Sequence, residues 1–190
     1  MPQELNSLAN EMRDCQKCRL HLNRINVVPG EGNPHSEIVF VGEAPGAQEN
    51  KLGRPFVGAA GEFLDNLLKM VGWNRQDVYI TNIVKDQPPG NRDPMPDEIE
   101  ICTSTWLKHQ IKIIDPKVIV TLGRHAMNYF LPNMGSISQI HGRAFRKRNG
   151  KVYFPLFHPA VALYRPDMEK ILKTDFKKLP KLLRQLDNLT

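Results

Sequence analysis

Four short apolar runs, each bounded by turn-forming residues, recur along the chain. They lie at residues 38–41, 78–80, 118–122 and 152–157. Runs of this length without polar alternation are typical of strands buried on both faces of a parallel sheet. Pro155 falls inside the last run, which is unusual because proline cannot donate a ladder hydrogen bond.

Helical spacing of apolar residues separates these runs. The predicted helices cover residues 2–14, a segment that starts near 59, and residues 98–114, 123–129 and 168–186, the last with a break at Pro180. Alternating strands and helices predict an α/β fold. We expect a single domain over residues 1–190, with three α/β/α layers around a central, mainly parallel sheet of four strands.

The loop that follows the first run, Gly42 to Leu64, carries the richest candidate chemistry. It is rich in glycine and proline and contains two acids, Glu43 and Glu49, and an aromatic ring, Phe56. Ligands of open α/β sheets bind outside the carboxyl ends of the strands, so this loop is expected to line a pocket. The alternative is an ordinary connection whose glycines serve only turns.

Three of the four predicted strands end at polar residues, namely Glu43, Asn82 and His158. The carboxyl ends of parallel strands meet at one edge of a sheet, so these three side chains are expected to share one pocket.

Composition narrows the class of protein. Hydrophobic residues make up 41% and charged residues 24% of the 190, as is ordinary for a globular chain with one core. The formal charge of +6 suits a nucleic-acid partner, although many other proteins are as basic. No apolar run approaches the length of a membrane helix, and acids occur early in the chain. We therefore expect a cytoplasmic protein with no membrane partner.

The three cysteines are an odd number and do not suggest a disulfide framework. Cys15 and Cys18 form a Cys-x-x-Cys pair, which indicates metal binding or redox chemistry instead.

Five motifs occur in order along the chain. They are Gly42-Glu43-Ala44-Pro45-Gly46, GRPFVG at residues 53–58, TNIVK at 81–85, PPGNR at 88–92, and His158-Pro159-Ala160. Each motif alone is weak, but their order and spacing over nearly the whole chain are specific. Together they resemble the motifs of the thermostable, iron–sulfur uracil-DNA glycosylases usually called family four.

This resemblance implies a monofunctional DNA glycosylase that hydrolyses the N-glycosidic bond of uracil in DNA and so starts base-excision repair. Phe56 resembles the residue that stacks on the flipped base, and Asn82 resembles the amide that reads the polar edge of uracil. His158 resembles the histidine that donates a hydrogen bond to the uracil oxygen on which negative charge develops. The remaining uracil-binding positions implied by the family are Gly42, Glu43, Ala44 and Glu49, with Asn91 a further family position near the site.

Two positions depart from the better-known relatives outside family four. Ala44 stands where those relatives carry the aspartate that positions the attacking water, so the catalytic pair is expected to be Glu43 and His158. Glu43 would orient the water or the loop backbone. Gly46 stands where they use a tyrosine to exclude the methyl group of thymine, and by resemblance Glu49 fills that space.

Family four also implies a [4Fe-4S] cluster held by four cysteines. Cys15, Cys18 and Cys102 match three of these positions, and Asp86 occupies the fourth. A carboxylate is a harder ligand than a thiolate but can fill one corner of a cluster. We expect a [4Fe-4S] cluster with Asp86 as an atypical ligand. A three-iron cluster or a labile corner, and no cluster at all, are the alternatives.

A basic segment at residues 141–148 precedes the fourth run. Arg143 and Arg165 are expected to contact DNA phosphates, together with Lys85 and Arg92. The alternative for the basic segment is a solvated loop. By resemblance, Leu163 is the apolar wedge that enters the base stack.

The expected partner is uracil-containing DNA, single- or double-stranded, bound by a monomer. Two other functions remain as alternatives. One is a non-catalytic module that recognises uracil or abasic DNA, and the other is a glycosylase of the same fold with broader base specificity. Release of free uracil from an oligonucleotide separates an enzyme from a binding module.

Overall fold

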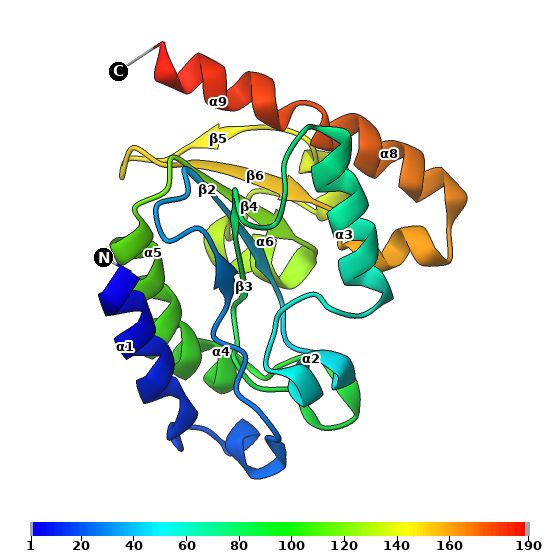
Figure 1. Ribbon diagram of the computed structural model, residues 1–190. Coiled ribbons are helices and arrows are strands. Elements are labelled where there is room, and N and C mark those ends of the chain that lie inside the picture. The colour runs from blue at the N-terminus through cyan, green and yellow to red at the C-terminus, as the bar shows by residue number, and fades with distance from the viewer. Residues whose placement is uncertain (1, 189–190) are drawn as a thin grey trace.

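The four apolar runs form the parallel strands at the centre of the computed structural model, which describes residues 2–188 of the chain (Figure 1). These strands are β2 (Ile38–Gly42), β3 (Tyr79–Asn82), β4 (Val118–Leu122) and β6 (Val152–Leu156). Every residue in them is buried, as the lack of polar alternation predicts for strands that are covered on both faces.

Two short strands that the sequence does not predict extend the sheet from four strands to six. β1 (Glu31–Gly32) pairs antiparallel with β3, and β5 (Phe145–Arg146) pairs antiparallel with β6. The strand order is β1-β3-β2-β4-β6-β5, so the sheet is mixed with a parallel centre. Each added strand has two residues, which is too short for a hydrophobic pattern to indicate it. Because β5 reaches only Val152 and Tyr153, Pro155 leaves no hydrogen bond to β5 unmade.

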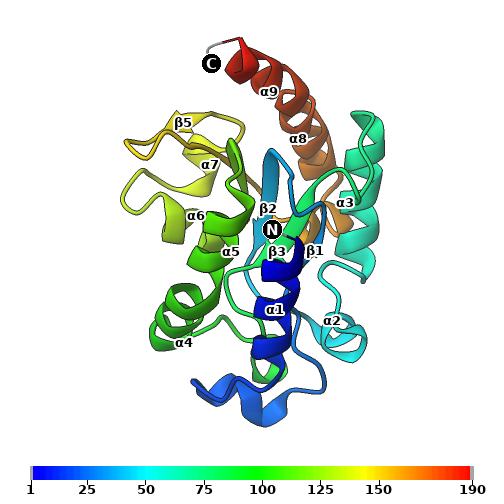
Figure 2. The same ribbon diagram turned by 60° about the vertical axis from the view of Figure 1, so that its left-hand side comes forward.

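Helices cover both faces of this sheet (Figure 2). One face packs against α1 (Pro2–Arg13), α5 (Lys108–Ile114) and α6 (Arg124–Phe130). The other packs against α3 (Ala59–Met70), α8 (Pro166–Phe176) and α9 (Leu179–Asp187). Alternate strand residues face opposite cores, as Val39 and Phe40 do. The predicted α/β/α arrangement is therefore confirmed. No helix in residues 2–188 combines the length and the apolar character that crossing a membrane requires.

Several predicted segments have a finer structure than the sequence indicates. The predicted helix over 98–114 comprises α4 (Pro96–Cys102), the π-helical turn η3 (Thr103–Leu107) and α5. The last predicted helix divides into α8 and α9, because Pro180 lies in the first turn of α9, where a missing N–H is tolerated. The remaining short segments are η1 (Arg19–Asn23), α2 (Ala47–Leu52), η2 (Pro89–Asn91), α7 (Ile137–Ile140) and η4 (Pro159–Leu163).

The carboxyl ends of the four parallel strands meet at one edge of the sheet. The pairing of β2 and β3 continues past the strand ends, since the N–H groups of Ile83 and Val84 donate to the carbonyls of Gly42 and Glu43 at 2.9 and 3.1 Å. These bonds fix the backbone from which Glu43 and Asn82 project.

Candidate active site

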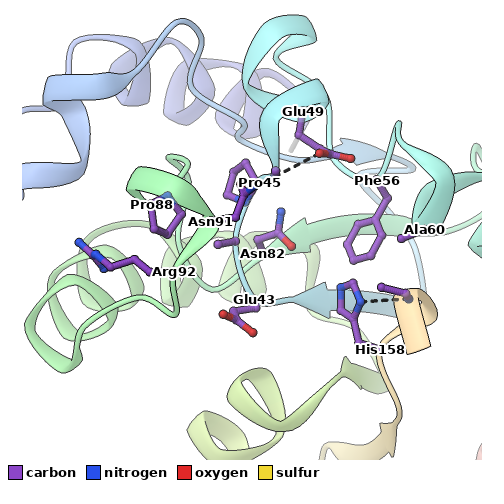
Figure 3. A pocket seen from close by; sticks show the side chains of 13 residues that line it. Glu43, Pro45, Glu49, Phe56, Ala60, Asn82, Pro88, Asn91, Arg92 and His158 are labelled. Atoms are coloured by element: carbon purple, nitrogen blue, oxygen red, sulfur yellow. Dashed lines mark hydrogen bonds between the residues drawn. The ribbon is translucent and has the colours of Figure 1, made fainter. Parts of the chain in front are cut away.

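A cavity of about 400 Å³ opens at this edge of the sheet (Figure 3). The predicted pocket residues that line it are Glu43, Ala44, Glu49, Phe56, Asn82, Asn91 and His158. The structure thus brings together side chains from the ends of three different strands. The lining also includes Pro45, Ala60, Pro88, Arg92 and Ala160, to which the sequence analysis assigns no part in the base pocket.

The Phe56 ring forms one wall of this cavity and lies against the His158 imidazole, with 5.6 Å between ring centroids and 28° between planes. Gly42 has no side chain where one would collide with both pocket groups. A Cβ at Gly42 would lie 2.6 Å from the Phe56 ring and 2.4 Å from the Asn82 amide oxygen. Gly42 is not among the lining residues and lies behind the pocket wall, and its part in uracil binding stays a prediction.

Phe56 adopts a left-handed backbone conformation, with φ of 52°, that is rare for an aromatic residue. Arg75 braces this turn by donating to the carbonyl oxygens of Pro55 and Phe56 at 2.6 and 3.2 Å. Gly61 allows the first turn of α3 to approach, because a Cβ there would lie 1.8 Å from the Phe56 carbonyl oxygen. These contacts therefore fix the position of the Phe56 ring before any base binds.

The Asn82 amide is the unsatisfied group of this pocket. The residue is 2% exposed, and its side-chain oxygen has no hydrogen-bond partner within the described part of the chain. Its backbone is fixed because the Lys85 ammonium donates to the Asn82 carbonyl at 2.7 Å. A buried acceptor without a donor destabilises the protein, by about 1–3 kcal/mol in typical cases. Such a group is prepared for a ligand that carries an N–H.

The tautomer of His158 follows from one hydrogen bond. The backbone N–H of Ala160 donates to Nδ1 at 3.2 Å, so the neutral imidazole carries its proton on Nε2. Burial lowers the pKa of His158 to about 4, which keeps the ring neutral at pH 7. His158 is therefore a neutral hydrogen-bond donor on the pocket wall.

Glu49 is fully engaged by backbone groups. One carboxylate oxygen accepts from Gly46 N–H at 3.1 Å, and the other accepts from Val57 and Gly58 at 2.9 and 3.1 Å. The carboxylate lies beside Gly46, where a Cβ would be 2.8 Å from it. The side chain occupies the space next to Gly46 and also ties the two halves of the pocket loop together.

Glu43 is half-buried at the pocket wall, and burial raises the pKa of its carboxyl group. Its nearest titratable neighbour is His125, whose Nε2 lies 3.8 Å from a carboxylate oxygen. His125 was not predicted as a site residue, although the sequence carries a signal for it. Gly123, Arg124 and His125 follow β4, which is the one parallel strand to which no polar end residue was assigned.

The three cysteines lie on the same side of the molecule, packed with one hydrophobic core. Burial above all, and the nearby Asp86 carboxylate as well, raises the pKa of the Cys18 thiol, and burial raises the pKa of Cys102 to about 12. Cys15 affects the pKa of Cys18 and Cys18 affects that of Cys102, so the thiols lie near one another, and thiolates are the ligands that an iron–sulfur cluster prefers. The fourth corner does not fit as it stands, because both Asp86 oxygens accept hydrogen bonds from Arg24 at 2.7 and 2.8 Å.

Some of the residues predicted to contact DNA are exposed, whereas others are bonded to groups of the protein. Leu163 is 43% exposed on η4, and Arg143 is exposed. Arg165 is exposed but paired with Asp167 at 2.7 Å. The expectation that Lys85 contacts a phosphate is wrong, because Lys85 is 1% exposed and its ammonium bonds Thr81 and Asn82. Arg92 is likewise bound to the buried Glu98, at 2.7 and 2.8 Å.

Comparison with known proteins shows the family of this chain. Residues 29–186 match the family model described as the uracil DNA glycosylase superfamily, so the chain belongs to that superfamily. It is 50% identical over 186 residues to the type-4 uracil-DNA glycosylase of Sulfurisphaera tokodaii, a match that covers 94% of this chain and 84% of the relative. It is 46% identical over 190 residues to that of Saccharolobus solfataricus, covering 94% and 86%. For Archaeoglobus fulgidus the values are 45% over 187 residues, covering 95% and 94%. Within the superfamily the chain thus falls among the type-4 enzymes, and the resemblance drawn from the motifs is confirmed.

Proposed function

We propose that this protein is a monofunctional uracil-DNA glycosylase that removes uracil from DNA, leaves an abasic site and so starts base-excision repair in the cytoplasm. The observation that carries the proposal is the buried, unpartnered Asn82 oxygen beside Phe56 and His158. The cavity of about 400 Å³ has room for a flipped pyrimidine. Family membership supports the same function.

Recognition of the base follows from the two ends of the Asn82 amide. The uracil N3–H donates to the side-chain oxygen, and the amide NH₂ donates to uracil O4. Cytosine carries an acceptor at N3 and a donor at its exocyclic group, so it would leave both ends of the amide unpaired. Phe56 stacks on the face of the base. This pattern selects uracil over cytosine through the cost of unmade hydrogen bonds.

The chemical step is hydrolysis of the C1′–N1 bond. The bonding electron pair leaves with the base, and Nε2–H of His158 donates a hydrogen bond to uracil O2, where negative charge develops. The oxygen of a water molecule bonds to C1′, and the proton of the water passes to the Glu43 carboxylate. Uracil then takes up a proton from solvent. No proton leaves His158, in keeping with its lowered pKa of about 4.

Selection against thymine is assigned to Glu49. Its carboxylate lies beside Gly46, on the side of the pocket where the family excludes the 5-methyl group. Three backbone N–H groups hold it there, so the barrier is rigid. A glycosylase of broader base specificity would need this space to be open.

DNA binding is assigned to the surface around the cavity. Leu163 enters the space left by the flipped nucleotide, which offsets part of the unstacking free energy. Arg143 and Arg165 contact phosphates, and Arg165 exchanges its Asp167 partner for one of them. We propose a monomer that acts on both single- and double-stranded DNA.

Cys15, Cys18 and Cys102 would hold an iron–sulfur cluster, which when bound supplies structural cross-linking between distant segments. The N-terminal segment after α1 and the end of α4 would be joined in this way. Asp86 completes a four-ligand set only if it leaves Arg24. None of the steps above uses this group.

An oligonucleotide assay tests the proposal directly. Wild-type protein is incubated with labelled single- and double-stranded DNA that carries one uracil, with thymine, hypoxanthine and cytosine substrates as controls. We expect free uracil and an abasic site, and no thymine or cytosine release. Asn82→Asp should slow uracil release by about a hundredfold or more, because a carboxylate cannot donate to O4.

Two results would decide for the alternatives. Tight binding of uracil-containing DNA without release of the base would indicate a non-catalytic module. Comparable release of hypoxanthine would indicate broader specificity. Unchanged uracil release by Asn82→Asp would remove Asn82 from the recognition role.

A further inference from the structure

Next to Glu43 lies a group of charged side chains that the mechanism above does not use. Arg124 and His125 begin α6, and Asp93 lies in the loop between η2 and α4. One donor atom from each of Glu43, Asp93 and His125 lies within 4.8 Å of the other two. Elements that are far apart in sequence therefore meet at the carboxylate that faces the base pocket.

Arg124 organises this group. Its Nη2 donates to Asp93 Oδ2 at 2.6 Å, and its Nε lies 2.9 Å from His125 Nε2. The same His125 nitrogen lies 3.1 Å from Asp93 Oδ2 and 3.8 Å from Glu43 Oε2. His125 Nε2 thus lies between two carboxylates, and Asp93 and Arg124 contact this same nitrogen.

Two carboxylates and an imidazole converge here much as the ligands of a divalent cation do. The Arg124 guanidinium already supplies positive charge to this group, because it bonds both Asp93 and His125. A metal ion would have to displace it. The contacts therefore describe an ion pair between Arg124 and Asp93 that holds the His125 ring.

Glu43 needs such a neighbour more than an exposed acid would. Ala44 offers no carboxylate beside it and Glu49 is held by backbone groups, so among the described residues that line the cavity Glu43 is the carboxylate free to accept a proton from water. Burial has the largest effect and raises the pKa of Glu43. His125 and, more weakly, Arg124 lower this pKa, whereas Asp93 raises it. A carboxylate that accepts a proton must be ionised when the water attacks.

The other charged or titratable groups that the structure describes around the cavity are engaged elsewhere and do not interact with the Glu43 carboxylate. Glu49 is held by three backbone N–H groups, and Arg92 is bound to Glu98. His158 Nδ1 is used by Ala160 N–H. In the described part of the chain, positive charge reaches Glu43 from Arg124 and from His125 when its ring is protonated.

We propose that His125, anchored by Asp93 and Arg124, is a positioning residue that orients the Glu43 carboxylate toward the attacking water. The inference rests on the glycosylase function proposed above. As the water oxygen bonds to C1′ and the C1′–N1 electron pair leaves with uracil, the water proton passes to Glu43. His125 touches none of the reacting atoms and acts only through Glu43.

Single-turnover uracil release from a single-stranded oligonucleotide, measured across pH, tests this role. His125→Gln is compared with His109→Gln, the same change at an exposed position on α5. We expect His125→Gln to lower the rate about tenfold and to move the acid limb of the pH profile to higher pH. His109→Gln should leave both unchanged. Arg124→Gln removes positive charge at a side chain that is 64% exposed and should move the acid limb in the same direction as His125→Gln.

A double-mutant comparison separates positioning from general damage to the fold. In a Glu43→Gln background, His125→Gln should cause no further loss, because the residue through which it acts is already altered. Equal losses in both backgrounds, or unchanged pH profiles in His125→Gln and Arg124→Gln, would overturn the proposal. So would wild-type activity that a chelator abolishes and Zn²⁺ restores.

The same experiment distinguishes failure of the positioning role of His125 from failure of the glycosylase function. Wild-type protein that releases no uracil contradicts the glycosylase function, and the positioning role falls with it. Active wild-type protein with a His125→Gln variant that behaves like His109→Gln contradicts the positioning role alone.

Discussion

The Arg24 guanidinium holds both carboxylate oxygens of Asp86, with 2.7 Å from Nε to Oδ1 and 2.8 Å from Nη2 to Oδ2. The same guanidinium donates to the backbone carbonyls of Arg13 and Cys15 at 2.8 and 2.7 Å. This ion pair therefore joins the end of α1 to the loop after β3. A cluster ligand at position 86 would make the same connection, so the two arrangements compete for one carboxylate.

Restoring a thiolate at position 86 should favour the cluster. We expect anaerobically purified Asp86→Cys to contain more iron and sulfide per chain than the wild type and to lose iron more slowly to a chelator or oxygen, because iron in a sulfide cluster prefers thiolate. Its melting temperature should rise when the iron is retained, since ligation free energy adds to folding free energy. Iron and sulfide analysis with thermal melts measures both effects, and uracil release should change little.

Asp86→Asn is the matched control, because it removes the charge without adding a thiolate. Arg24 is 11% exposed, so loss of its partner should destabilise the protein by about 3–5 kcal/mol. Asp167→Asn, in an exposed ion pair, should have no measurable effect. Equal iron content in wild type and Asp86→Cys would contradict the competition between Arg24 and iron. If Cys15, Cys18 and Cys102 are free thiols and no iron is present in either protein, a cluster is excluded.

His158→Ala should slow uracil release by about a hundredfold or more while DNA binding survives, because a donor to the developing charge on O2 is lost. The pH dependence distinguishes its role from that of Glu43. With a pKa lowered to about 4 by burial, His158 stays neutral at higher pH, so the fall in rate on the acid side reports protonation of Glu43, whose pKa is raised. The acid limb should persist in His158→Ala and disappear in Glu43→Gln. If the acid limb disappears in His158→Ala but persists in Glu43→Gln, the limb belongs to His158 and not to Glu43.

Glu49→Gly should open the pocket beside Gly46 and allow measurable release of thymine from a G·T mismatch. The variant also loses the acceptor for three backbone N–H groups, so its uracil activity should fall as the loop loosens. Glu49→Gln keeps the volume of the side chain and serves as control, with thymine still excluded. Strict exclusion of thymine by an active Glu49→Gly would show that another residue closes this side of the pocket.

The parallel core of the fold could be predicted because its signals are local. The run at 118–122 coincides with β4, and the run at 152–157 differs from β6 by one residue. β1 and β5 could not be predicted, since two residues carry no periodicity and their pairing depends on distant strands. The helix break at Pro180 was placed slightly late, because proline is tolerated in the first turn of the helix that follows it.

Some features of the site could likewise be predicted from the sequence, and others could not. Glu43, Asn82 and His158 were expected to share a pocket because strand order implies it, and the structure places all three around one cavity. Lys85 was misassigned to DNA, since sequence gives its charge but not its burial among Thr81 and Asn82. The pairing of Asp86 with Arg24 was missed because 62 positions separate the two residues.

The unpartnered oxygen of Asn82 also has a consequence for turnover. It accepts the N3–H of uracil whether or not the base is still attached to deoxyribose, so the group that admits the substrate also retains the product. Free uracil should compete with DNA for the enzyme, and steady-state rates should fall below the rate of a single cycle. Selectivity for the base and prompt departure of the base therefore oppose one another in this pocket.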